Sequence, residues 1–208
     1  IVNGLLYQGV SILAAPSKIG KSWFALDLGL SVAAGKYFMG FKTVKSKVVY
    51  FALEDSWTRL QGRLKKLTKG SSVPEGLQLV NKCATLNEGF FDQVDGLVEQ
   101  DPEIGLVIID TLQKVKPPTN SQVSAYESDY RLFSTIGKYA GAHDIAILFL
   151  HHTRKKNGYD VDPFENILGS TALQGATDTM FVIDKDKRTD SEAHFYASGR
   201  DIDTQDLL

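Results

Sequence analysis

Val10-Ser11-Ile12-Leu13-Ala14-Ala15-Pro16-Ser17-Lys18-Ile19-Gly20-Lys21-Ser22 joins a mostly apolar run to a short turn that contains proline and glycine. The run at residues 10–15 has the length and composition of a buried strand. Residues 21–34 read as a helix, and Gly35 stands where helices commonly end. A strand, a turn and a helix in this order direct backbone N–H groups and the positive end of the helix dipole at one point. The stretch therefore predicts a P-loop that binds a di- or triphosphate.

Individual roles follow from the P-loop pattern G-x-x-x-x-G-K-[ST]. Lys21 is expected to reach the β and γ phosphates of a nucleotide, and Ser22 to bind Mg²⁺. Ala15 departs from the pattern, which has glycine there, whereas Gly20 agrees with it. The alternative is a surface loop that happens to contain Gly-Lys-Ser, but the flanking strand and helix favour nucleotide binding. The residues expected to bind ATP are Pro16, Ser17, Lys18, Ile19, Gly20, Lys21, Ser22 and Trp23.

Length and composition are those of a single globular domain. With 208 residues and 43% hydrophobic content, the chain can bury one sizeable core. It contains no apolar run of the roughly 18 residues that a membrane span requires, so we expect no membrane partner. Cys83 is the only cysteine, which fits the reducing cytoplasm and provides no disulfide framework. The chain begins at Ile1 rather than methionine, and we expect residues 1–208 to be one domain of a longer protein.

The charge of the chain limits its possible contacts with nucleic acid. Its net charge is −2, because 25 acidic residues outnumber 23 Lys and Arg residues. This balance argues against a broad basic face. Any contact with nucleic acid must therefore be confined to a few loops or be assembled from several copies of the chain.

Beyond the P-loop, apolar runs of strand length alternate with amphipathic stretches of helix length. This alternation is typical of an α/β fold, in which helices cover both faces of a mostly parallel sheet. The expected strands are 10–15, 47–53, 78–80, 106–110, 145–151, 179–184 and 193–198. The expected helices are 21–34, 57–67, 89–99 and 125–142. The last two strands have no helix of ordinary length between them, so we expect the sheet to finish with antiparallel strands.

Two acidic sites lie where strands of such a sheet would end, at the edge where open α/β sheets bind ligands. Asp110 follows the apolar run at 106–109, and we expect it to hold Mg²⁺ as the second acidic element of P-loop enzymes. Glu54 follows the apolar run at 50–53, and a glutamate beside the γ-phosphate can orient and deprotonate the attacking water. Glu54 is therefore the expected catalytic base.

The residues after Glu54 admit other interpretations. Asp55 or Ser56 could simply cap the helix that begins at Trp57, and this role is compatible with a catalytic Glu54 because a cap requires only one residue. Two adjacent carboxylates could also indicate a two-metal nuclease. The P-loop argues against that reading, because such a nuclease does not need one.

The order of these motifs resembles that of the RecA-like ATPases, and within them the RepA-type branch of hexameric replicative helicases. The resemblance covers nearly the whole chain, and its most specific parts are the tandem Glu54-Asp55 and the tandem His151-His152. It is carried by Ile19-Gly20-Lys21-Ser22-Trp23, Ala25-Leu26-Asp27-Leu28, Leu53-Glu54-Asp55-Ser56, Arg59-Leu60-Gln61-Gly62-Arg63-Leu64, Ile109-Asp110-Thr111, His151-His152-Thr153, Gly169-Ser170 and Gly175-Ala176-Thr177-Asp178. It implies a RecA-like three-layer αβα sandwich and a ring-shaped homo-oligomer, most often a hexamer.

The resemblance also implies roles for later residues. His152, beside His151, is expected to sense the γ-phosphate, because imidazole can donate to a phosphate oxygen while staying largely neutral near pH 7. Zinc ligation is the rival reading, but the remaining soft partners have no ligand spacing. Two locally basic segments, expected to be loops, would line the ring channel and touch single-stranded DNA; the alternative is ordinary solvated loops. Their basic residues are Lys114, Lys116, Arg154, Lys155 and Lys156.

Arg200 matches the position of an arginine that reaches the γ-phosphate of a neighbouring subunit in hexameric relatives. Such an arginine finger accelerates hydrolysis by roughly 10³ to 10⁵. A salt bridge to Asp201 or Asp203 is the alternative role, and Arg188 is an alternative finger.

The function expected from these residues is ATP hydrolysis by a motor domain, and the resemblance implies a DNA helicase that replicates a plasmid, phage or integrated element. Two alternatives remain open. One is a nucleotide-responsive regulatory or assembly ATPase without helicase activity. The other is a small-molecule kinase, which would need an acceptor pocket and usually an arginine-rich lid; the sequence shows no such lid.

Overall fold

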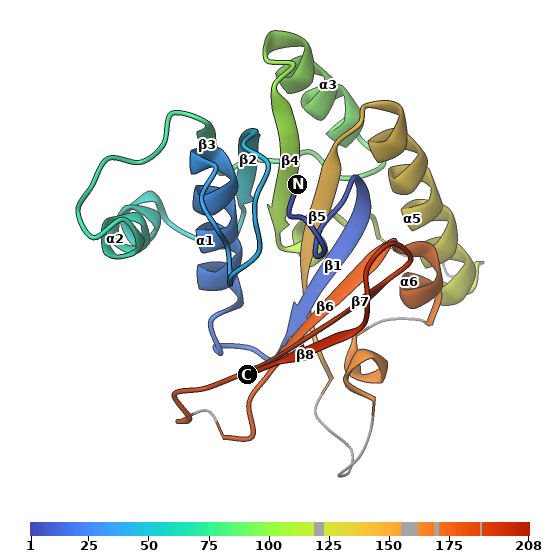
Figure 1. The fold of residues 1–208 in the computed structure, drawn as a ribbon. Helices are drawn as coiled ribbons and strands as arrows, with labels where there is room; N and C mark the ends of the chain where they lie inside the picture. Colours follow the sequence, from blue (N-terminus) through green and yellow to red (C-terminus); the bar gives the residue numbers. More distant parts are fainter. Residues whose placement is uncertain (119–122, 155–161, 169–170, 188) are drawn as a thin grey trace.

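The strand before the P-loop lies inside an eight-stranded sheet. The fold is that of a computed structural model, which describes residues 1–118, 123–154, 162–168, 171–187 and 189–208 (Figure 1). The strands are β1 (Gly9–Ala15), β2 (Lys47–Ala52), β3 (Leu77–Val80), β4 (Ile104–Asp110), β5 (Ala146–His152), β6 (Thr179–Asp184), β7 (His194–Gly199) and β8 (Gln205–Leu207). The helices are α1 (Lys21–Ala34), α2 (Trp57–Leu67), α3 (Phe90–Gln100), α4 (Leu112–Val115), α5 (Ala125–Ala142), the 3-10 helix η1 (Pro163–Asn166) and α6 (Thr171–Ala176).

The strand order across the sheet is β3-β2-β4-β5-β1-β6-β7-β8. The six strands from β3 to β6 run parallel, β7 pairs antiparallel with β6, and β8 pairs antiparallel with β7. The predicted α/β fold and its antiparallel finish are therefore confirmed. Because β5 lies between β1 and β4, the ends of these three strands bring the P-loop, His152 and Asp110 to one edge of the sheet.

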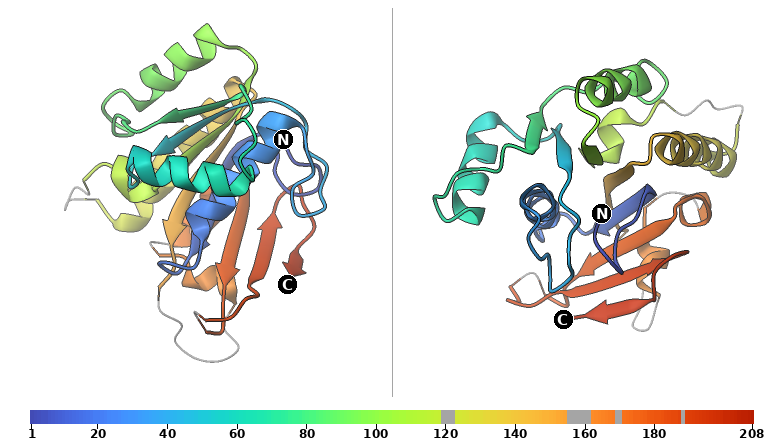
Figure 2. Two further views of the ribbon diagram at one scale, coloured as in Figure 1. Left: turned by 90° about the vertical axis from the view of Figure 1, so that its left-hand side faces the viewer. Right: turned by 45° about the horizontal axis from the view of Figure 1, so that its top comes forward.

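Alternation along the strands divides the core into two layers. On β2, Val48, Tyr50 and Ala52 pack on the face covered by α1 and α2, whereas Val49 and Phe51 pack on the face covered by α3, α4, α5 and α6. Figures 1 and 2 show α1 and α2 on one side of the twisted sheet and α3, α5 and α6 on the other. The structure is therefore the expected three-layer sandwich.

The longer elements match their predicted ranges closely. α1, α2 and α5 have the predicted bounds, and Gly35 ends α1 in the left-handed conformation, with φ at 65°. The predicted bounds of 179–184 are those of β6, and the other predicted strand bounds differ from the structure by at most two residues. The predicted strand at 78–80 is β3, and the chain from residue 81 to 89 forms no strand.

The prediction that the segment with Lys114 and Lys116, after Thr111, forms a loop is in part wrong. Leu112 and Val115 form the short helix α4, because their spacing of three residues places both side chains, each 0% exposed, against the same core layer. Lys114 therefore lies on a helix, with its side chain exposed. Four residues are too few for a periodic pattern, and for the same reason η1, α6 and β8 were not predicted.

Across the parts of the chain that the structure describes, no helix has the length and apolarity needed to cross a lipid bilayer.

Candidate functional site

A cavity of about 720 Å³ opens at the carboxyl-terminal ends of β1, β2, β4 and β5. The whole predicted ATP-binding segment, residues 16–23, lines it, together with Glu54, Asp110 and His152. The structure thus brings together residues that are up to 136 positions apart in the sequence, from Pro16 to His152. Arg59 and Arg63 also line this cavity, and the sequence had not assigned them a role.

The backbone of the P-loop explains its glycine pattern. Gly20 caps the start of α1 with φ at 108°, a conformation that favours glycine. Ala15, by contrast, is the last residue of β1 and is fully buried, and its backbone pairs with that of His152 on β5. Extended backbone accepts a Cβ atom, so the departure of Ala15 from the glycine pattern leaves the strand intact.

Lys21 is nearly buried at the floor of the cavity, with 7% of its surface exposed. Its Nζ donates to the carbonyl oxygen of His151 at 2.6 Å and lies 3.3 Å from Nδ1 of His152. Burial lowers the Lys21 pKa from 10.5 to about 8, although the nearby carboxylates of Asp110 and Glu54 oppose this fall. The ammonium group remains mainly charged at pH 7.

Asp110 has the surroundings of a metal-binding carboxylate. Its side chain hydrogen-bonds with the side chain of Ser22, and Tyr50 donates its hydroxyl to Oδ2 at 2.9 Å. Burial raises the pKa of Asp110, while the hydrogen bonds from Ser22 and Tyr50 and the charge of Lys21 oppose this rise. Burial, together with the charge of Asp110, holds the pKa of Tyr50 well above its usual value, so the hydroxyl stays a donor.

Ser22 and Asp110 make a donor set suited to Mg²⁺. Both are oxygen ligands, and Mg²⁺ commonly takes one or two protein oxygens and completes its shell with water and substrate phosphates. Among the described residues no group of three or more His, Cys, Asp and Glu side chains could hold a metal by itself. A site that is completed by a nucleotide fits this composition.

The tandem carboxylates Glu54 and Asp55 point to different partners. Glu54 lines the cavity, and its Oε1 accepts a hydrogen bond of 3.4 Å from the hydroxyl of Thr111. Asp55, with a side chain only 5% exposed, forms salt bridges with Arg59 and Arg63 on α2. Ser56 rather than Asp55 caps α2, since its hydroxyl accepts from the backbone of Arg59.

The tandem histidines likewise separate, because neighbouring residues of a strand face opposite sides. His152 faces the cavity, where its Nδ1 accepts from Lys21, and burial lowers its pKa. His151 lies in the other layer, where its Nε2 donates to the carbonyl oxygen of Leu168 at 2.6 Å. Burial lowers the pKa of His151 to about 4, so it is neutral at pH 7. Only His152 is in a position to meet a nucleotide.

An aromatic and cationic cluster joins the P-loop helix to α2. The guanidinium of Arg63 lies 5.5 Å from the centroid of the Trp23 ring, and the ammonium of Lys66 lies 5.8 Å from it. Asp55 anchors the same arginine. The sequence signal for this cluster is the spacing of four residues between Arg59 and Arg63, which places both on one face of α2 near Asp55.

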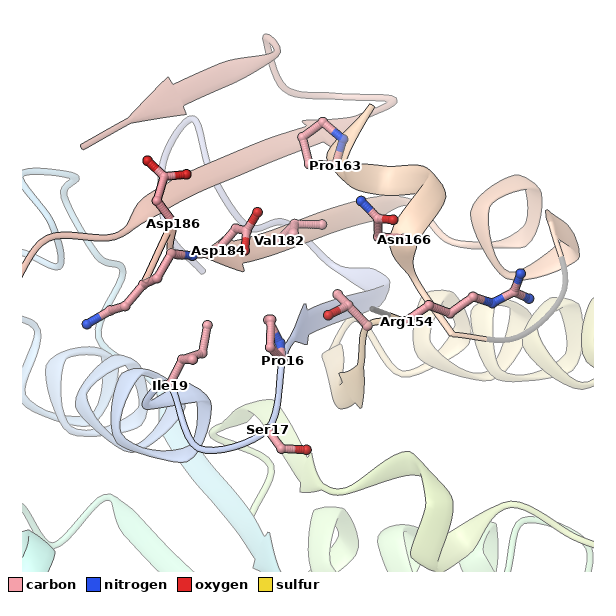
Figure 3. Close-up of a pocket in the computed structure, with 11 residues that line it drawn as sticks. Pro16, Ser17, Ile19, Arg154, Pro163, Asn166, Val182, Asp184 and Asp186 are labelled. Atoms are coloured by element: carbon pink, nitrogen blue, oxygen red, sulfur yellow. Dashed lines mark hydrogen bonds between the residues drawn. The ribbon is translucent and has the colours of Figure 1, made fainter. Parts of the chain in front are cut away.

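A second cavity of about 490 Å³ adjoins the P-loop on the side of β6. In Figure 3, Pro16 and Ile19 from the loop lie across it from Val182, Asp184 and Asp186. Asn166 and Pro163 of η1 border it at one end. The two cavities share the loop residues Pro16, Ser17 and Ile19 and therefore lie next to each other.

Arg200 lies far from its own P-loop. Its guanidinium donates to Asp178 Oδ1 and to the carbonyl oxygen of Gly175, each at 3.1 Å, and Asp178 is bonded to the backbone of Val10 at the start of β1. The P-loop follows the other end of this seven-residue strand, about 20 Å away at ~3.3 Å per residue. The salt-bridge partner of Arg200 is thus Asp178. The alternative prediction, a salt bridge to Asp201 or Asp203, was wrong.

The basic residues expected to contact DNA have separate surroundings. Lys116 forms a salt bridge with the buried Asp129. The backbone N–H of Arg154 donates to the carbonyl oxygen of Asn166, and its side chain runs away from Asp184 in Figure 3. Lys155, Lys156 and Arg188, and the motif residues Gly169 and Ser170, lie outside the described residues.

Comparison with known proteins identifies the fold. A family model described as "AAA domain" matches residues 1–158. The ATPase domain of G40P superposes with a TM-score of 0.73 at 14% sequence identity, covering 97% of this chain and 81% of that one. A DnaB-like replicative helicase, in a structure that addresses its interactions with primase, superposes with a TM-score of 0.75 at 15% identity. That comparison covers 98% of this chain and 56% of the helicase chain. No curated protein sequence matches.

These likenesses confirm the predicted RecA-like architecture and its resemblance to helicase ATPase domains in fold. At 14–15% identity they concern the fold alone. In all, 527 chains of solved structures match, so the architecture by itself selects no single activity. The function must be argued from the residues in the cavity.

Proposed function

The chain belongs to the AAA domain family, and we propose that it hydrolyses ATP as the motor domain of a DNA helicase. The observation that carries this proposal is the meeting of Lys21, Ser22, Glu54, Asp110 and His152 around one cavity at the sheet edge. A phosphate-binding lysine, a metal-binding pair, a base and a polar sensor are the groups that ATP hydrolysis by a P-loop enzyme requires.

The two adjoining cavities suggest how ATP binds. The triphosphate would lie over residues 17–22, where the N-terminus of α1 and the ammonium of Lys21 neutralise its charge. The nucleoside would extend into the cavity beside β6, where Pro16, Ile19 and Val182 offer apolar contact. Asn166 and Asp186 offer polar groups to the sugar and base there.

Ser22 and Asp110 would hold Mg²⁺ with the nucleotide. When bound, this ion neutralises charge on the β and γ phosphates. Asp110 is already held in place by Tyr50 and Ser22, so the protein needs little rearrangement of this carboxylate. Lys21, in contrast, donates to the carbonyl oxygen of His151 in the nucleotide-free chain, and a bound phosphate would compete for its ammonium group.

Hydrolysis would begin with the carboxylate of Glu54, which takes a proton from the water that attacks the γ-phosphorus. The hydroxyl of Thr111 donates to Glu54 and keeps the carboxylate turned into the cavity. His152, neutral at pH 7, can hydrogen-bond to the γ-phosphate and is the last residue of β5. Loss of the γ-phosphate would therefore remove a hydrogen bond at the point where the segment after β5 begins.

A helicase needs a ring and a DNA strand in addition to the ATP site. We propose that copies of the chain form a homo-oligomeric ring, most simply a hexamer, around single-stranded DNA. The position of Arg200 supports this arrangement. Arg200 lies too far from the P-loop of its own subunit to contact a nucleotide there, and its side chain is exposed and can approach the ATP site of a neighbouring subunit. The segments that carry Lys114, Lys116, Arg154, Lys155 and Lys156 would face the strand, and the setting would be replication of a plasmid, phage or integrated element.

The test of ATP hydrolysis uses Glu54→Gln, which keeps the shape of the side chain and removes the base. We expect this variant to bind MgATP like the wild type and to hydrolyse it about 10² to 10⁴ times more slowly. Gln78→Glu, a conservative change at an exposed position on β3, is the matched control and is expected to leave turnover unchanged. Wild-type turnover in Glu54→Gln would contradict the role of Glu54.

A further inference from the structure

Tyr50 is a fully buried tyrosine whose hydroxyl is hydrogen-bonded to Asp110, a residue that lines the functional cavity. It lies on β2 with 0% of its surface exposed, and it donates to Oδ2 of Asp110, itself 2% exposed, at 2.9 Å. Burying a hydroxyl costs free energy unless it forms a hydrogen bond, and phenylalanine would fill the same space without this cost. The hydrogen bond to Asp110 therefore offsets the cost of burying this hydroxyl in the core.

The sheet register explains how the two residues meet. Tyr50 pairs with Ile108 on β4, and Asp110 lies two residues further along β4 on the same face. Diagonal neighbours of this kind are within reach of a long aromatic side chain. Ala52 is the residue directly opposite Asp110, and its small side chain leaves room for the phenol to approach the carboxylate.

We propose that Tyr50 is a positioning residue that fixes the orientation of the Asp110 carboxylate for binding the Mg²⁺ of MgATP. The inference rests on the proposed function, because it assigns Asp110 to the nucleotide's metal. The hydrogen bond holds Oδ2 and prevents the carboxylate from rotating about its Cβ–Cγ bond. The ligand therefore does not have to be ordered when the ion arrives.

Tyr50 also joins the metal carboxylate to the strand that carries the base. β2 ends at Ala52, and Glu54 follows two residues later, where Thr111, the neighbour of Asp110, donates to it. Two side-chain hydrogen bonds thus join the end of β2 to the end of β4. The spacing between the metal ligand and the base is set by this pair of contacts together with the sheet.

Tyr50→Phe removes only the hydroxyl and tests the proposal by binding alone. The affinity of the purified chain for a fluorescent ATP analogue is measured in EDTA and then across a Mg²⁺ titration. We expect the Mg²⁺ concentration at half-saturation to rise by about 10- to 100-fold, the usual effect of losing a partner of a metal ligand. The affinity in EDTA should stay within about twofold, since Tyr50 does not line the cavity.

Tyr139→Phe is a matched control. Its hydroxyl also donates to a carboxylate, that of Asp95, but the pair lies on α5 and α3, away from the P-loop. This variant should have the wild-type Mg²⁺ dependence. In an Asp110→Asn background, Tyr50→Phe should cause no further shift, because Tyr50 acts through Asp110.

The outcomes separate this inference from the proposed function. An unchanged Mg²⁺ half-saturation in Tyr50→Phe, or an equal loss of affinity with and without Mg²⁺, would overturn the role of Tyr50 while leaving ATP binding intact. A wild-type chain that binds no nucleotide would overturn the proposed function and this inference with it. A shift that persists undiminished in the Asp110→Asn background would also overturn the inference.

Discussion

The ammonium nitrogen of Lys21 donates a hydrogen bond of 2.6 Å to the main-chain carbonyl oxygen of His151. The P-loop lysine is thus attached to the end of β5 in the nucleotide-free chain. A bound triphosphate would compete for the same ammonium group, and nucleotide binding would then weaken this link between Lys21 and the end of β5. The burial of Lys21 and of the neighbouring His151 makes the stability of the fold depend on pH.

Lys21→Met should stabilise the nucleotide-free chain at pH 7. In the folded chain the Lys21 pKa is about 8, below the 10.5 of an exposed lysine, so burying the charged group costs up to about 3 kcal/mol. The folded state binds fewer protons between pH 8 and 10.5, so wild-type stability rises there and the advantage of the variant shrinks. Urea unfolding at pH 7 and pH 10 measures this, with the exposed Lys65→Met as control. A destabilised Lys21→Met at pH 7 would show the account of this charge to be wrong.

His151 should make the fold sensitive to acid. Its pKa is about 4 in the folded chain against 6.5 when exposed, so the unfolded chain binds more protons between these values. This contribution is complete above pH 6.5 and is lost as the pH falls toward 4, by about 2 to 3 kcal/mol in all. His151→Gln, which keeps a donor for the Leu168 carbonyl, should flatten this dependence relative to the wild type, whereas His194→Gln, at a half-exposed position on β7, should not. Equal slopes in wild type and His151→Gln would refute the prediction.

Arg200 should act on a neighbouring subunit. Arg200→Ala and Lys21→Ala are each expected to lose hydrolysis, the first by roughly 10³- to 10⁵-fold. Mixed at equal concentrations, they should recover part of the activity, because an intact Lys21 site can meet an intact Arg200 across an interface. Arg131→Ala, which removes another exposed arginine, is the control and should retain turnover. The absence of recovery at every mixing ratio would contradict a site shared between subunits.

The sequence predicted the features that depend on local pattern. The P-loop, the bounds of α1 and the placement of Glu54 and Asp110 after buried strands all follow from runs of neighbouring residues. Gly35 also marked the end of α1 correctly, because its left-handed conformation is a local requirement. Such features need no knowledge of which strands lie side by side.

The contacts that depend on strand order and register could not be predicted. The bond from Tyr50 to Asp110 requires β2 beside β4 in a particular register, and one sequence does not reveal that register. The salt bridge of Arg200 to Asp178 requires β7 to fold back along β6. Strand alternation places His151 and His152 on opposite faces of the sheet. Alternation alone does not say which of the two faces the cavity, because that depends on which core layer covers each face.

The most direct test of the central claim is steady-state ATP hydrolysis by the purified chain, with and without single-stranded DNA, over a series of protein concentrations. Lys21→Ala is the inactive reference. A motor with sites shared between subunits should hydrolyse ATP faster when DNA is added, and its specific activity should rise with protein concentration. ATP binding without turnover at every concentration, with DNA present, would contradict the claim and favour a nucleotide-responsive regulatory protein.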